Sequence, residues 1–91
     1  MRRPKKMRSL KMPYAKQRRI YEICQNYKKQ PPRIREKIER LCLLACDGNE
    51  NNNKALFLVL TTERAVCNIA SEHFMSKSVL YDLRHKFYEL W

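Results

Sequence analysis

The spacing of apolar residues along the chain predicts a series of helices. Ile20, Cys24 and Tyr27 recur at the three- and four-residue intervals that place side chains on one helix face. We therefore expect an amphipathic helix over residues 14–29. The proline pair at 31–32 should end it, because proline has no backbone N–H to donate, and the same pair suits the first turn of a second helix.

The second expected helix carries a buried stripe and a marked end. The stripe consists of apolar residues at helical spacing: Ile34, Ile38, Leu41, Cys42 and Ala45. Leu43 and Leu44 widen this stripe, so the carboxyl end of the helix is expected to lie deeper in the core. Gly48 should supply the left-handed residue that ends the helix, and the asparagine-rich segment 47–53 should form a polar loop.

Three shorter patterns follow, and each predicts a further helix. The apolar run at 54–60 is better explained as a helix than as a strand, because a single strand would have nothing to pair with. Thr62 is a candidate cap for a helix over about 63–73, and Ser76 is a candidate cap for a last helix over 77–90. With one glycine in the whole chain and few β-branched runs, we expect an all-α fold of about five helices.

Chain length and the apolar runs indicate the domain organisation and the compartment. A chain of 91 residues makes one domain, which we place at residues 13–91 after a flexible basic arm at residues 1–12. No apolar run approaches the roughly 20 residues that cross a bilayer, and no apolar segment follows the basic amino terminus. We therefore expect no membrane partner and a cytoplasmic location.

The net charge of +11 is distributed unevenly between the two halves of the chain. Residues 1–40 hold fifteen lysines and arginines against three acids, whereas residues 41–91 hold five against six. Such an excess concentrates polyanions near the protein and predicts salt-dependent binding to a nucleic acid. The cations of the arm are expected to follow a DNA backbone or enter a minor groove: Arg2, Arg3, Lys5, Lys6 and Arg8.

Residues 63–90 contain the elements of a helix-turn-helix. Two helices that cross at a tight turn need a small residue at the crossing and a capping residue on the second helix, which Ala70 and Ser76 supply. Apolar residues surround the crossing: Ile69, Met75, Leu80 and Leu83. Two positions depart from the pattern, because His73 stands where an apolar residue is usual and Phe74 where glycine is usual.

This segment resembles a known group of proteins. The stretch from Ala65 through Phe-Met-Ser-Lys-Ser-Val-Leu-Tyr-Asp-Leu-Arg-His-Lys-Phe-Tyr is similar to the sigma-region-four-like helix-turn-helix of small phage and mobile-element transcription activators, of the ArpU and RinA type. The likeness covers residues 54–91, and its most specific feature is Ser-x-Ser-x-Leu-Tyr before a basic and aromatic helix end. The resemblance implies a recognition helix at 77–90 in the DNA major groove, action at promoters, and RNA polymerase as a further partner.

The last expected helix has one face for the core and one face for DNA. Its core residues are expected to be Leu80, Leu83, Phe87 and Leu90. Its DNA-binding residues are expected to be Ser76, Lys77, Ser78, Tyr81, Arg84 and His85. Hydroxyls at a helix amino terminus donate to phosphate, and a lysine there reaches phosphate or guanine, so Lys77 is the leading candidate. Asp82 would accept from a cytosine amino group or point away from the DNA.

The remaining chemistry-bearing residues predict structural roles. Cys24, Cys42, Cys46 and Cys67 lie within apolar helical patterns and are expected to be reduced core residues. A zinc site in which Cys67 or His73 joins the pair at 42 and 46 stays open as an alternative. No nucleophile with its base, phosphate loop or paired inward carboxylates is present, so we expect no enzymatic activity and no cofactor.

The sequence thus favours a sequence-specific, double-stranded DNA-binding regulator of transcription. One alternative is a small helical interaction module that binds an acidic partner, such as a polymerase subunit or a host enzyme. Binding of RNA by the basic helices is another, and the outward face of the last helix can also be an ordinary solvated surface. A homodimer is expected as well, because one small helix-turn-helix contacts few base pairs.

Overall fold

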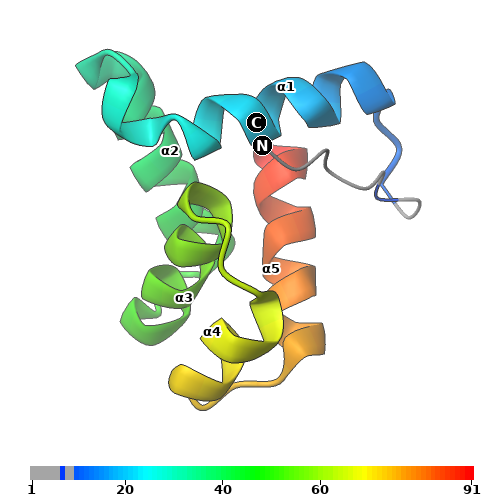
Figure 1. The fold of residues 1–91 in the computed structure, drawn as a ribbon, viewed down its shortest axis with the longest axis vertical. Coiled ribbons are helices and arrows are strands. Elements are labelled where there is room, and N and C mark those ends of the chain that lie inside the picture. Colours follow the sequence, from blue (N-terminus) through cyan, green and yellow to red (C-terminus); the bar gives the residue numbers. More distant parts are fainter. Residues whose placement is uncertain (1–6, 8–9) are drawn as a thin grey trace.

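The structure, a computed structural model, describes Met7 and residues 10–91. Its five α-helices are α1 (Tyr14–Gln25), α2 (Pro32–Ala45), α3 (Glu50–Thr61), α4 (Val66–Glu72) and α5 (Lys77–Leu90), and a 3-10 helix, η1 (Tyr27–Lys29), follows α1 (Figure 1). The described residues contain no strand, so the all-α prediction is confirmed. Within the same residues, no helix has both the length and the apolar character needed to cross a bilayer.

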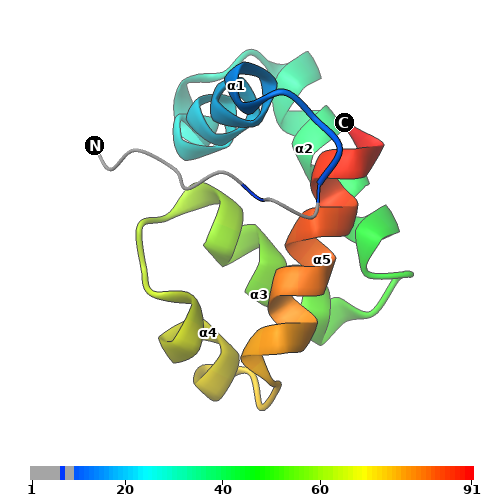
Figure 2. The ribbon, with the colours of Figure 1, turned by 90° about the vertical axis from the view of Figure 1, so that its right-hand side faces the viewer.

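Helix α5 is the axis around which the other helices are arranged. It runs along the long axis of the molecule, with α1 lying across its carboxyl end and α4 near its amino end (Figures 1 and 2). Helices α2 and α3 both pack against α5 and against each other, and α4 packs against α3 and α5. The basic first helix and the expected helix-turn-helix therefore lie at opposite ends of the molecule.

The core takes fully buried side chains from all five helices. The largest of these side chains without exposed surface are Ile20, Ile38, Leu56, Ile69, Leu80 and Phe87. Short helices are marginal on their own in water, so their stability comes mostly from burying one apolar face against neighbours. Packing into this common core therefore stabilises α4, a helix of only seven residues.

Helix α2 confirms its predicted start but corrects its predicted end. Pro32 opens the helix, and the backbone N–H of Gly48 donates to the Leu43 carbonyl at 3.1 Å to close it. Asp47 (φ 50°) precedes Gly48 (φ 79°) in the left-handed region, so glycine is not alone there. Leu43 and Leu44 are exposed rather than deep in the core, because at 3.6 residues per turn they lie outside the narrow face that packs on α3 and α5.

Two predicted connections are also wrong in detail. The segment 47–53 is not all loop, because Asn49 caps α3 by accepting the N–H of Asn52 at 3.0 Å. Thr62 does not cap the next helix, since its hydroxyl donates to the Leu58 carbonyl at 2.5 Å and so belongs to the end of α3. Helix α4 begins only at Val66, without a side-chain cap.

The described part of the expected arm packs onto the domain. Leu10 is buried in the core, and Met7 and Met12 pack beside it. Gln17, buried in α1, accepts the backbone N–H of Met7 at 2.8 Å and donates its amide to the Met12 carbonyl at 3.0 Å. The predicted helix over 14–29 is itself divided, because α1 stops at Gln25 and η1 continues the path.

Candidate nucleic-acid interface

Helices α4 and α5 meet at a tight turn and share a small core with α3. Ile69 and Ala70 of α4 are buried, as is Leu80 of α5. The small side chain at position 70 lets the two helices approach, as the sequence pattern predicted. The packing of α3, α4 and α5 against one another fixes the position of the amino end of α5.

The turn at residues 73–75 closes with the hydrogen bonds of a left-handed helix end. The N–H of Met75 donates to the Ala70 carbonyl at 3.0 Å, and the N–H of Phe74 donates to the Ser71 carbonyl at 3.2 Å. Phe74 has φ 55°, the left-handed conformation for which glycine is normally used. The departure at position 74 therefore leaves the turn geometry intact, and a phenylalanine carries the conformation instead.

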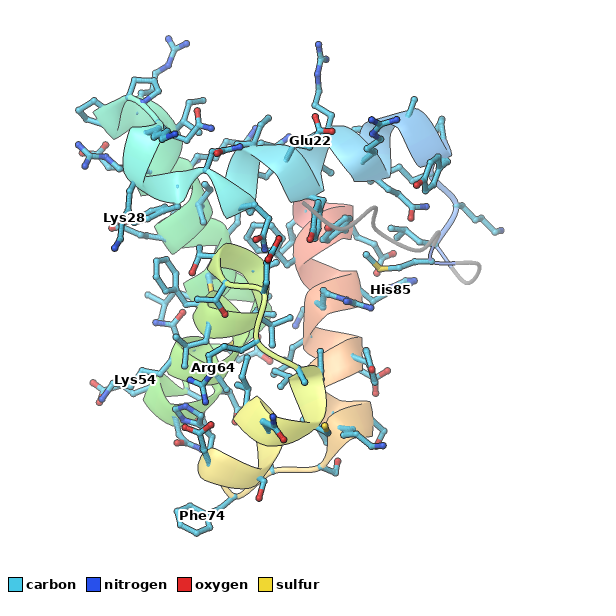
Figure 3. The ribbon with its side chains drawn as sticks, viewed as in Figure 1. Glu22, Lys28, Lys54, Arg64, Phe74 and His85 are labelled. Carbon is cyan, nitrogen blue, oxygen red and sulfur yellow. The ribbon has the colours of Figure 1, made fainter. Side chains whose placement is uncertain are left out.

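Phe74 is a candidate contact residue that the sequence pattern did not identify as one. Its side chain is 96% exposed and projects from the tip of the turn (Figure 3). A left-handed conformation costs a non-glycine residue about 1–2 kcal/mol, and an exposed phenyl ring gains nothing from burial. Strain of this kind is often found where a side chain has a functional role. The signal in the sequence was a large apolar residue at a position that requires positive φ.

His73, the other departure, is explained by a contact from α3. The Asn51 side-chain amide donates to the His73 carbonyl at 2.7 Å, and its oxygen lies 3.3 Å from the imidazole Nδ1. A polar residue at this position therefore holds the turn against the start of α3. It does so through hydrogen bonds in place of the usual apolar contact.

The amino end of α5 is capped and exposed. The Ser76 hydroxyl accepts the N–H of Val79 at 3.2 Å, which confirms the predicted cap, and lies 3.2 Å from the hydroxyl of Ser78. Ser76, Lys77 and Ser78 are all exposed. Lys77 has no hydrogen-bond or ion-pair partner among the residues that the structure describes. The first turn of α5 is therefore available to a ligand.

Three of the predicted site residues share one edge of α5. Lys77, Tyr81 and Arg84 line a surface hollow of about 520 Å³, and the segment 64–67 before and at the start of α4 lines it from the other side. The guanidinium of Arg84 lies 5.0 Å from the centre of the Tyr81 ring, within the range of a cation–π contact. Arg84 is half-buried, so only part of its side chain is open to solvent.

His85 and Leu90 differ from the predicted arrangement. His85 is half-buried on a different edge of α5, and its Nδ1 lies 2.9 Å from a carboxylate oxygen of Glu89 (Figure 3). Leu90, predicted for the core, is 42% exposed, and Tyr88 is buried in its place. The reason is α1, which lies across this end of α5 and covers the Tyr88 side. Burial raises the pKa of the Tyr88 hydroxyl, and nearby Cys24 of α1 raises it further.

The predicted cations of the arm lie outside the described residues: Arg2, Arg3, Lys5, Lys6 and Arg8. Met7, which is described, lines the same hollow as Lys77 and Arg84. The basic residues of α1 are placed differently, since α1 crosses the end of α5 that is remote from the turn (Figure 1). They therefore do not lie beside the predicted recognition surface.

The cysteines are not all core residues. Cys24, Cys42 and Cys46 are buried, whereas Cys67 is exposed, contrary to the prediction. Burial raises the pKa of the Cys24 thiol to about 12 and raises that of Cys42 as well. Thiols held in the protonated form are poor nucleophiles and poor metal ligands. Among the described residues, no three histidine, cysteine or acidic side chains gather as a metal site would require.

Comparison of the chain with protein-family models, with curated proteins and with solved structures gave no match. The function proposed below therefore depends on the geometry of the turn and of α5.

Proposed function

We propose that the protein binds double-stranded DNA in a sequence-specific way and regulates transcription, as the resemblance to phage and mobile-element activators implies. In this proposal, the amino-terminal half of α5 enters the major groove. The supporting observation is the exposed first turn of α5, capped by Ser76, with Lys77 unpaired among the described residues. A cytoplasmic location and a contact with RNA polymerase belong to the same proposal.

The exposed groups suit the two tasks of a recognition helix. A B-form major groove is about 12 Å wide and admits one α-helix. Hydroxyls and backbone N–H groups at the start of α5 can donate to phosphate, where the helix dipole also favours an anion. Lys77 and Tyr81 follow on the same side and can reach a phosphate or a base edge. In this arrangement, Ser76 and Ser78 position the helix and Lys77 reads a base.

Three neighbouring residues have different roles in this proposal. His85 is paired with Glu89, so we assign it to helix stability rather than to base contact. Asp82 is exposed and can accept from a cytosine amino group. Phe74, at the tip of the turn, joins the proposed contact set, because an apolar side chain there can pack on a thymine methyl group.

The basic arm supplies non-specific affinity in this proposal. Residues 63–91 hold four cations and four acids, so their attraction to phosphate is small. Met7 of the arm lines the same hollow as Lys77. Leu10 is a core residue, so the arm is tested by changing Arg2, Arg3, Lys5 and Lys6 to glutamine rather than by deletion through residue 11. The affinity for DNA should fall. The slope of log affinity against log salt concentration should become shallower by about 0.9 for each lost phosphate contact.

Selection of bound sequences from a random duplex pool tests the sequence specificity. We expect one motif to be enriched by the full chain. Lys77→Ala should lose about tenfold or more of the preference for that motif over a scrambled duplex, since a good base contact is worth roughly 1–3 kcal/mol. Lys16→Ala, an exposed lysine on α1, is the matched control and should keep the preference. Absence of any enriched motif would contradict the proposal.

A homodimer is the proposed binding unit, because a single helix-turn-helix reads too few base pairs for tight specificity. The enriched motif should then be a palindrome, with half-sites about one helical turn apart. Sedimentation of the complex with the motif should give two chains per duplex. A non-palindromic motif bound by one chain would show that the monomer suffices.

A further inference from the structure

A second surface, on the side formed by η1 and α3, has a different chemistry. A groove of about 520 Å³ lies where the end of α1 and η1 meet the last turns of α3. Its floor is formed by Tyr27, Phe57 and Leu58, and Lys28 and Lys29 stand on its margin. None of these residues belongs to the proposed DNA-binding surface.

The floor of this groove is held in place by contacts within the protein. The rings of Tyr27 and Phe57 meet edge to face, with centres 4.9 Å apart and planes at 88°. The Tyr27 hydroxyl donates to the Glu39 carboxylate. The Gln25 amide donates to the carbonyls of Leu60 and Thr62, each at 3.0 Å, and so joins α1 to the end of α3. A floor that is already ordered loses little entropy when a ligand binds.

The margin of the groove is positively charged and unpaired. Lys28 and Lys29 are exposed, and neither has a partner among the described residues. Lys54 lies one helical turn before Phe57 and Leu58 on the outer face of α3, and Lys28 and Lys54 lie on the same side of the molecule (Figure 3). Glu39 of α2 accepts the hydrogen bond of the Tyr27 hydroxyl, and no acid is among the residues that line the groove. An apolar floor between cations is complementary to a ligand that is both apolar and acidic.

The same features argue against two other occupants. A nucleic acid is bound by stacking on open ring faces and by a continuous cationic track, whereas the rings here pack against each other and the floor is apolar. A second copy of the chain is a poor source of acidic segments, because its net charge is +11. The occupant should therefore come from a different protein.

We propose that this groove binds a short, acidic, amphipathic segment of another protein. Apolar side chains of the segment pack on Phe57 and Leu58, and its carboxylates face Lys28, Lys29 and Lys54. This is the mode in which an amphipathic helix lies in an apolar groove, with charge complementarity favouring the acidic partner. The site is separate from α5, so it stays available when DNA is bound. The proposal stands whether or not α5 binds DNA.

The test uses the full chain and a designed probe. The probe is a fluorescein-labelled, 16-residue helical peptide with leucine and phenylalanine along one face and glutamate elsewhere. One control peptide has glutamine in place of glutamate, and a second keeps glutamate but has alanine in place of the apolar residues. Fluorescence polarisation measures affinity, and amide chemical shifts of ¹⁵N-labelled protein locate the peptide.

We expect the probe to bind more tightly than both control peptides and to shift the amides of residues 25–29 and 57–62. The double variant Lys28→Glu, Lys29→Glu should bind it at least about tenfold more weakly, which corresponds to about 1.4 kcal/mol. The double variant Lys11→Glu, Lys16→Glu, which changes exposed lysines elsewhere, should bind normally.

Four results would overturn the proposal. The first two are that the probe does not bind, or that it shifts only amides outside the groove. The third is that the peptide without apolar residues binds as tightly as the probe. The fourth is that duplex DNA, and not the probe, shifts the groove amides. The last result would make the groove a nucleic-acid site. Failure of the DNA selection experiment would leave these peptide measurements unaffected, so the two proposals fail separately.

Discussion

The two ends of the molecule differ in charge and in shape, and the proposed binding of DNA would need both. The basic end, formed by α1, η1 and the first half of α2, has ten lysines and arginines against three glutamates over residues 10–40. The helix-turn-helix end, formed by α4, the turn at 73–75 and the first half of α5, belongs to a segment with as many acids as cations. Positive charge is therefore concentrated at the end that lacks an exposed, capped helix start. The exposed, capped start of α5 lies at the end where acids and cations balance.

The two ends also differ in the interactions that fix their local structure. At the basic end, the buried Gln17 side chain bonds the backbone at Met7 and Met12, so a polar group organises the entry of the chain. At the helix-turn-helix end, the small Ala70 and the left-handed Phe74 set the turn, and Asn51 fixes it to α3. Each end should consequently respond to its own substitutions, and both should respond to the shared core.

The largest effect should come from the core that joins the two ends. Leu80→Ala removes a side chain with no exposed surface from the middle of the fold. Such truncations cost about 2–5 kcal/mol in the free energy of unfolding, because a cavity is left behind. Leu90→Ala, on the same helix but 42% exposed, is the matched control and should cost much less. Equal losses in urea unfolding would mean that Leu90 is buried after all.

The next effect should be confined to the basic end. Gln17→Ala leaves the Met7 N–H and the Met12 carbonyl without their side-chain partner, which should cost about 1–3 kcal/mol. Amide hydrogen exchange should increase around residues 7–20 and stay unchanged in α4. Arg19→Ala, an exposed neighbour on α1, provides the control and should leave exchange unaltered. Faster exchange throughout the chain would show that the two ends are not separable.

A third test compares one cysteine from each end. Burial raises the pKa of the Cys24 thiol from 9.0 to about 12 in the folded protein. Between these values the unfolded chain loses the proton while the folded chain keeps it, so the free energy of unfolding should fall as pH rises from about 9 toward 12. The loss from this group is about 1.4 kcal/mol per pH unit within that window.

Cys24→Ala should weaken this dependence on pH, and Cys67→Ala, at an exposed position, is the control substitution. Urea unfolding at pH 8, 9 and 10 gives the comparison. An identical pH profile in Cys24→Ala and the parent chain would contradict the burial of that thiol.

The smallest effect should occur at the turn. Phe74→Gly relieves a left-handed conformation and should stabilise the fold by about 1 kcal/mol. The same substitution removes the exposed ring, so affinity for the enriched duplex should fall although stability rises. Phe74→Asn, which also tolerates positive φ, separates the conformation from the ring. Unchanged affinity in both variants would remove Phe74 from the contact surface.

Local signals explain why much of this fold could be predicted from the sequence. Pro32 opens α2 and Ser76 caps α5 through interactions that involve only a few neighbouring residues, so short patterns identified both starts. The small residue at the helix crossing was recognisable for the same reason. For the candidate site, this was enough to predict the exposed turn that carries Lys77 and Ser78.

Contacts between distant elements explain what the sequence did not predict. The exposure of Leu44 depends on which side of α2 faces α3 and α5. Tyr88 is buried and Leu90 is exposed because α1 crosses the end of α5. Thr62 could cap either of two adjacent helices, and its hydroxyl turns back to the Leu58 carbonyl. The spacing of apolar residues within a single helix predicts none of these contacts.

The most direct test of the division between the two ends is a titration of ¹⁵N-labelled protein with the enriched duplex, followed by amide chemical shifts. We predict the largest shifts between Phe74 and Tyr81, with little change at Lys28 and Lys29. Shifts centred on η1 and the start of α2, with Ser76 and Lys77 unmoved, would contradict the assignment of DNA recognition to α5.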